Sequence, residues 1–97
     1  VMLILFNFFT IFISGDDLMR AYILVNSEPG MIWEVAEAAL AIEGVKEAHA
    51  VTGQFDDIIQ VEFKKMEELG KIIEKVQGIK GVMRTQTLIV IPRPLRE

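Results

Sequence analysis

Four short segments after residue 18 have the residue patterns of β-strands. The first is rich in β-branched and aromatic residues and apolar on both faces, as a strand in the middle of a sheet would be. In the third, Ile59, Val61 and Phe63 alternate with polar residues, which predicts a strand with one exposed face. Pro92 prevents the fourth from continuing. The predicted strands cover residues 20–26, 45–51, 59–64 and 82–91.

Between these segments, apolar residues recur twice at helical spacing, with glutamates and lysines on the other positions. Pro29 is well placed near the start of the first helix, where its missing N–H has no partner to lose. Gly44 and Gly78 follow the two apolar stripes and predict the helix ends. The predicted inward positions are Ile32, Val35, Ala36, Ala39 and Leu40 in the first helix, and Leu69, Ile72, Ile73 and Val76 in the second.

The order strand, helix, strand, strand, helix, strand predicts an α+β, ferredoxin-like βαββαβ fold. Residues 43–46 and 77–80 resemble each other, and each closes a helix and begins a strand, as two split βαβ half-units would. Right-handed crossovers then place both helices on one face of a four-stranded antiparallel sheet. The other face holds either Tyr22 and Leu24 or Ile23 and Val25. It is too apolar for water, so we expect a dimer made by stacking two sheets.

Residues 1–18 differ in composition from the rest of the chain. Residues 1–13 carry no charge, are too short to span a bilayer and lack the basic start of a signal peptide. They could form an extra oligomer-packing element or a targeting segment. We favour a misassigned gene start, with translation beginning at Met19, and an intact mass of the protein from its native gene would test this. Residues 19–92 then form the domain, and residues 93–97 a polar tail.

Composition narrows the functional class. The chain has 97 residues, enough for one domain, and 52% of them are hydrophobic, a surplus that predicts self-association. There is no cysteine, so a disulfide framework, a zinc knuckle and a thiol catalyst are excluded. The net charge is −4 and the lysines of residues 64–80 are interleaved with glutamates, which argues against direct nucleic-acid binding. We expect a cytoplasmic protein with no membrane partner.

The sequence offers no recognisable catalytic centre. The single histidine, His49, has no Cys or His partner, and no Ser-His-Asp or Gly-rich phosphate motif is present. Asp56 and Asp57 are adjacent, and on a strand they would point to opposite faces and share neither substrate nor metal. We therefore expect no enzyme activity, no metal site and no cofactor.

The turn after the second strand contains Thr-Gly-Gln-Phe-Asp at residues 52–56, and the last strand contains Thr-Gln-Thr-Leu-Ile at residues 85–89. With these motifs, residues 19 to about 91 resemble the RAM domain, the ligand-binding and oligomerisation domain of the Lrp/AsnC transcriptional regulators. In that family the domain binds amino acids where dimers meet, and the dimers assemble into rings. The helix-turn-helix domain that precedes it in the family is missing here, so the chain resembles the stand-alone RAM proteins.

The resemblance implies a site in this chain. Thr52 and the Gly53 backbone would contact the polar groups of the ligand, Phe55 would pack between dimers, and Asp56 would accept hydrogen bonds from the α-ammonium. Thr85 and Thr87 would form a wall, from the same or a neighbouring subunit. Asp57 departs from the family, where an apolar residue is more usual, and would either favour a ligand with a polar or cationic end or face solvent.

Each of these residues also has a purely structural interpretation. Gly53 is ordinary turn chemistry, Asp56 can cap the turn, and threonines are common in strands. We assign Trp33 and Phe63 to the core.

The function expected from the resemblance is a non-enzymatic amino-acid-binding and oligomerisation module. It would form a homodimer and a larger ring of dimers, and would modulate transcription of amino-acid metabolism, alone or with a full-length Lrp/AsnC regulator. The alternatives are a ligand-free oligomeric scaffold and a small dimeric α/β-barrel enzyme.

Overall fold

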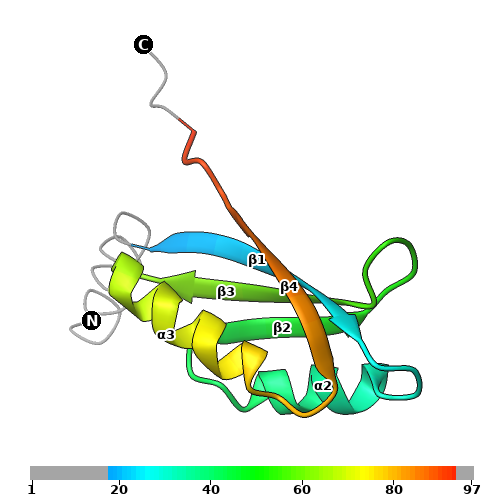
Figure 1. Cartoon of the computed structure of the whole chain (residues 1–97). Helices are drawn as coiled ribbons and strands as arrows, with labels where there is room; N and C mark the ends of the chain where they lie inside the picture. Colours follow the sequence, from blue (N-terminus) through cyan, green and yellow to red (C-terminus); the bar gives the residue numbers. More distant parts are fainter. Residues whose placement is uncertain (1–17, 94–97) are drawn as a thin grey trace, which may run out of the picture.

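A computed structural model describes residues 18–93, and in them the six predicted elements occur in the predicted order (Figure 1). The extension assigned to residues 1–18 and the tail assigned to residues 93–97 lie outside the described residues, apart from Leu18 and Arg93. The elements are β1 (Met19–Ser27), α2 (Ile32–Leu40), β2 (Val45–Ala50), β3 (Asp57–Phe63), α3 (Met66–Gln77) and β4 (Val82–Ile89).

The sheet is antiparallel throughout, with strand order β2-β3-β1-β4. β1 is therefore a central strand, as its apolar character predicts, and β4 is an edge strand. Both helices lie on the same face of the sheet (Figure 1). The ferredoxin-like prediction is confirmed. The same connectivity brings the end of β1, the start of α2, the β2–β3 turn and the start of β4 to one end of the sheet.

Alternate residues of the two central strands form the core beneath the helices. Ile23 of β1 pairs with Ile59 of β3, and Ala21 pairs with Val61, and all four are fully buried. Burying each large aliphatic side chain contributes about 1.5–3 kcal/mol. Phe63 is also buried, as predicted. The helices complete the core with Val35, Ala36, Ala39, Leu69, Ile72 and Val76.

The register resolves which residues face away from the helices. Tyr22 and Leu24 lie on the open face of the sheet, where they join Ile58, and all three are half-buried in the isolated chain. The chain after β4 continues away from the body of the domain, and Ile91 in this stretch is 86% exposed (Figure 1). The open face and residues 88–91 thus form part of the exposed apolar surface of the described residues.

Two helix predictions are wrong in detail. Trp33 is 67% exposed instead of buried, because the stripe of α2 that faces the sheet runs through Val35, Ala36 and Ala39. Leu40, the last residue of α2, is 52% exposed because the helix ends there, four residues before Gly44. Gly44 instead closes the following loop with φ +100°.

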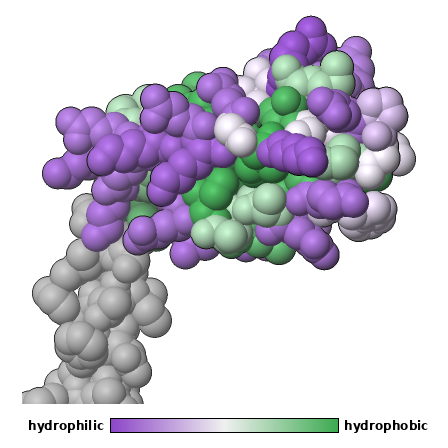
Figure 2. Space-filling model, turned by 60° about the horizontal axis from the view of Figure 1, so that its bottom comes forward, coloured by the Kyte–Doolittle hydropathy of each residue, from purple (hydrophilic) through white to green (hydrophobic). Residues whose placement is uncertain are grey.

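Figure 2 shows the domain from the α2 side of Figure 1. Hydrophobic residues gather in the middle of this face, and hydrophilic residues surround them. Neither helix of the described residues is long and apolar enough to cross a membrane.

Candidate functional site

The turn between β2 and β3, residues 51–56, carries four of the six predicted site residues. Val51 N–H donates to the Asp56 carbonyl at 2.9 Å and closes the turn. Gly53 has φ +117°, a conformation that side-chain-bearing residues rarely adopt, and no atom lies within 4 Å of the position of a Cβ there. Backbone geometry, and not space, therefore requires this glycine. Thr52 and Gly53 are exposed, and Phe55 and Asp56 are half-buried.

Three hydrogen bonds hold the 51–56 turn against the end of β1. Asp56 N–H donates to the Val25 carbonyl at 2.8 Å, and Ser27 N–H donates to Asp56 Oδ2 at 2.8 Å. The Asn26 amide donates to the Gln54 carbonyl at 2.8 Å. The Asp56 carboxylate is thus held in place by a backbone donor to Oδ2. The bond to Ser27 gives Asp56 a structural role, and its role as a ligand acceptor stays a prediction.

Asn26 also connects the turn to β4. Its Oδ1 accepts a hydrogen bond from an Arg84 guanidinium nitrogen at 3.3 Å. Both side chains lie on the open face of the sheet, where Asn26 and Arg84 are register partners. Asn26, Ser27 and Arg84 are not among the site residues predicted from the sequence. No local motif marks them, since β1 and β4 meet the turn only in the folded sheet.

Asp57 is fully buried, which excludes the expectation that it faces solvent. Its Oδ2 accepts a hydrogen bond from the Ser27 hydroxyl at 2.6 Å, while its buried Oδ1 has no partner among the described residues. Burial raises the pKa of the Asp57 carboxyl, the Ser27 hydrogen bond opposes this rise, and the neighbouring charge of Asp56 adds to it. Asp57 is the one buried Asp or Glu side chain among the described residues.

Asp56 and Asp57 are not both strand residues, as the expectation for them assumed, and the expectation that they share neither substrate nor metal stays a prediction. The Asp56 carboxylate accepts a hydrogen bond from the Ser27 backbone N–H, and the Asp57 carboxylate accepts one from the Ser27 hydroxyl. The reason is that β3 begins at Asp57, so Asp56 belongs to the turn and does not follow the alternation of a strand.

Thr85 and Thr87 do not join the 51–56 turn within one chain. They pair with Val25 and Ile23 of β1 and face the helices, and the Thr85 hydroxyl accepts a hydrogen bond from the Gln77 side chain at 3.2 Å. β1 separates them from the turn, since Val25 is bonded to Asp56 on its other side. The structure thus brings together Thr52, Gly53, Phe55 and Asp56, and leaves the two threonines apart.

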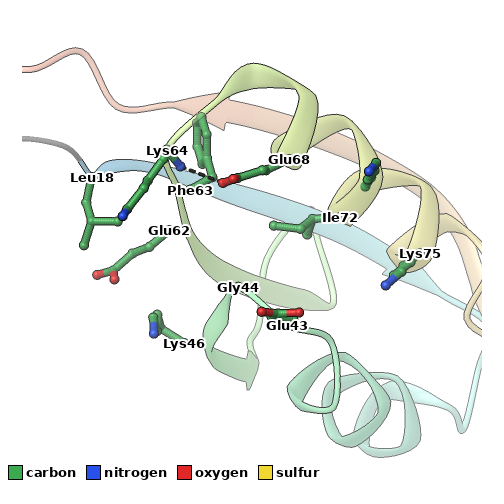
Figure 3. A pocket seen from close by; sticks show the side chains of 11 residues that line it. Leu18, Glu43, Gly44, Lys46, Glu62, Phe63, Lys64, Glu68, Ile72 and Lys75 are labelled. Atoms are coloured by element: carbon green, nitrogen blue, oxygen red, sulfur yellow. Dashed lines mark hydrogen bonds between the residues drawn. The ribbon is translucent and has the colours of Figure 1, made fainter. Parts of the chain in front are cut away.

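A concavity in the described residues lies at the other end of the sheet (Figure 3). It has a volume of about 550 Å³, with Phe63 and Ile72 among its apolar lining and Lys46, Lys64 and Lys75 among its charged lining. The 51–56 turn, in contrast, protrudes from the domain (Figure 1). A ligand at the turn would therefore need a neighbouring subunit to enclose it. Among residues 18–93, no group of three or more His, Cys, Asp or Glu side chains could hold a metal ion.

His49 lies on the surface, as expected for a histidine without a metal-ligating partner. Its Nε2 is 2.8 Å from Glu47 Oε1, and both side chains are exposed.

Comparison with known proteins identifies the family. The profile of the Lrp/AsnC ligand binding domain matches residues 20–97. The chain belongs to this family. It is 42% identical over 73 residues, 71% of the chain, to an uncharacterized HTH-type transcriptional regulator of Pyrococcus furiosus, and the match covers 49% of that regulator. The chain therefore spans about half the length of the curated relatives of this kind.

Two solved structures share the fold of this chain. A hypothetical protein of Pyrococcus horikoshii superimposes with a TM-score of 0.70 and 36% identity, over 77% of this chain and 92% of that one. A transcriptional regulator of Neisseria meningitidis, solved as a complex with L-Met, gives a TM-score of 0.68 at 21% identity, over 80% and 53% of the two chains. A match to homocitrate synthase of Sulfurisphaera tokodaii, 40% identical over 77% of this chain, covers 16% of that enzyme. The chain is thus a ligand-binding domain of a family of transcriptional regulators.

Proposed function

We propose that this Lrp/AsnC domain binds an α-amino acid at the 51–56 turn, without catalysis, and that binding is coupled to assembly of the domain. The observation that carries the proposal is the Asp56 carboxylate, fixed at 2.8 Å by the Ser27 N–H at the end of a central strand. Support also comes from the L-Met complex of the Neisseria meningitidis regulator, which has the same fold.

The chemistry of the turn suits a zwitterion, which needs a carboxylate at one end and donors at the other. Asp56 Oδ1 would accept from the α-ammonium, while the bond to Ser27 engages Oδ2. The exposed Thr52 hydroxyl and the Gly53 backbone offer polar contacts to the α-carboxylate. Arg84, positioned through Asn26, adds a cation on the open-face side of the turn.

Assembly would supply the enclosure that the protruding turn lacks. The half-buried Tyr22, Leu24 and Ile58 of the open face would be covered when two sheets stack about 10 Å apart. Phe55 would then pack between dimers, and Thr85 and Thr87 of a neighbouring subunit remain the proposed wall of the site. Because the ligand would contact more than one subunit, ligand binding and ring formation would strengthen each other. A full-length Lrp/AsnC regulator is a further proposed partner in such a ring.

A thermal-shift screen against the twenty amino acids tests the proposal, with Asp56→Ala as the site variant. A ligand at 100 times its Kd adds about 2.7 kcal/mol of stability to the wild type. The Asp56→Ala variant should remain folded, because Asp56 lies in the turn outside the strands, and it should lose the stabilisation by ligand. Glu47→Ala, which removes an exposed carboxylate from β2, is the matched control and should keep it. Equal ligand stabilisation in Asp56→Ala and wild type would remove Asp56 from the site.

A further inference from the structure

Two adjacent carboxylates at the 51–56 turn have no cationic partner in the described part of the chain. The ion pairs of residues 18–93 join Arg20 to Glu62 and His49 to Glu47, and neither includes Asp56 or Asp57. Both carboxylates instead bind donors of the same residue, Ser27, at 2.8 and 2.6 Å. The site therefore holds two carboxyl groups close together, stabilised by one backbone N–H and one hydroxyl.

Asp57 makes this arrangement costly for the isolated domain. Its carboxyl is fully buried, and Oδ1 has no hydrogen-bond partner among the described residues. An unsatisfied buried polar group costs about 1–3 kcal/mol, and more when it is charged. A cation near a buried carboxylate offsets this cost, because it favours the ionised form that burial opposes.

We propose that the ligand of this site is a basic amino acid, with its α-ammonium on Asp56 and its side-chain cation on Asp57. This inference rests on the proposed function, because it assigns the class of the amino acid bound at the 51–56 turn. A ligand with two cationic groups matches two neighbouring carboxylates. An aliphatic ligand would leave Asp57 unpaired, and an acidic ligand would add a third negative charge beside them.

The burial of Asp57 also implies a movement on binding. Because the carboxyl is closed to solvent, a ligand cation reaches it only if neighbouring backbone shifts. The adjacent Asp56 is held to β1 by its bonds to Val25 and Ser27, and Asn26 holds Gln54. These contacts join the turn to the central strand, and they would hold Asp56 in place while the shift makes Asp57 accessible.

Calorimetric titration of the 97-residue chain with L-lysine, L-arginine, L-leucine and L-glutamate tests the inference. The wild type should bind lysine or arginine at least about tenfold more tightly than leucine, a difference of about 1.4 kcal/mol. Asp57→Val should lose this preference and bind leucine at least as tightly as lysine. Asp57→Asn, which keeps an acceptor for Ser27, is the second variant in case the first does not fold, and should also lose it. Glu47→Gln is the matched control and should keep the preference of the wild type.

The outcomes separate this inference from the proposed function. If the wild type binds leucine more tightly than lysine and arginine, or if both Asp57 variants keep the preference for basic ligands, the turn is an amino-acid site but Asp57 does not select the ligand. If folded wild type binds none of the twenty amino acids, the proposed function and this inference are both wrong.

Discussion

The hydrogen bond between Ser27 and Asp57 gives a prediction about stability that does not depend on any ligand. Ser27→Ala removes the donor to Asp57 and leaves a fully buried carboxyl without a partner. The expected loss is about 1–3 kcal/mol, the cost of stranding a buried polar group. Asp57→Val alone leaves the Ser27 hydroxyl without its acceptor, and because Ser27 is only 7% exposed, water cannot readily replace that acceptor. The double variant replaces both partners by apolar groups and should be about as stable as the wild type, or more stable.

Urea unfolding of the four proteins, at one fixed protomer concentration, measures this cycle, because assembly makes apparent stability depend on concentration. In a domain of this size 1 kcal/mol corresponds to about 4–8 °C in Tm, so thermal unfolding is a second readout. Ser27→Ala leaves the backbone N–H that holds Asp56 in place, so the cycle isolates the buried pair. Additive losses in the double variant would show that the two side chains do not form a coupled buried pair.

The sign of the pH dependence follows from the raised pKa of Asp57. The folded domain holds this proton more tightly than the unfolded chain, whose carboxyl titrates near 3.8. The contribution of Asp57 to stability is therefore fully present below pH 3.8 and declines as the pH rises through the raised pKa. The stability of the double variant relative to wild type should increase over this interval and stay constant above it. A relative stability that falls as the pH rises would contradict a raised pKa.

Three further predictions concern positions outside the buried pair. Gly53→Ala should cost about 1–2 kcal/mol for its backbone conformation, and Gly44→Ala should cost more in urea unfolding, because its Cβ would lie 2.6 Å from Ile72 Cδ1; equal losses would contradict this packing. Glu68 accepts a hydrogen bond from Lys64 N–H at 2.8 Å, which lowers the pKa of the Glu68 carboxyl. Glu68→Gln should therefore lower Tm at pH 7, and the difference in Tm from wild type should disappear as the pH falls through the lowered pKa. Trp33→Ala should change the unfolding free energy by less than about 0.5 kcal/mol, since Trp33 is 67% exposed; a loss of several kcal/mol would show that Trp33 is buried.

The fold could be predicted because apolar residues alternate in the strands and recur at helical spacing in the helices. The alternation of Ile59, Val61 and Phe63 and the stripe through Val35 and Ala39 specify a sheet face and a helix face without any tertiary information. Trp33 was assigned to the core because tryptophan is apolar, although its position lies outside the helical spacing of the buried residues. Position 33 lies outside the buried stripe of α2, and the aromatic side chain does not override that geometry.

The candidate site was less predictable because its parts meet only in the folded sheet. The 52–56 motif locates the turn, but the register of β1 alone decides that Ser27 binds both Asp56 and Asp57. The side on which Thr85 lies depends in the same way on the pairing of β4 with β1. β3 begins at Asp57, two residues before the predicted start, so Asp57 belongs to the strand and Asp56 to the turn.

Hydrogen exchange of backbone amides with and without an amino acid tests the central claim, that the ligand binds at the 51–56 turn. We predict that saturating L-lysine slows exchange in residues 51–57 and at the end of β1, around Asn26 and Ser27. Residues 43–46 and 62–75, which line the concavity at the other end of the sheet, should exchange at unchanged rates. Protection confined to that concavity, with an unchanged turn, would contradict the account and place the ligand at the opposite end of the domain.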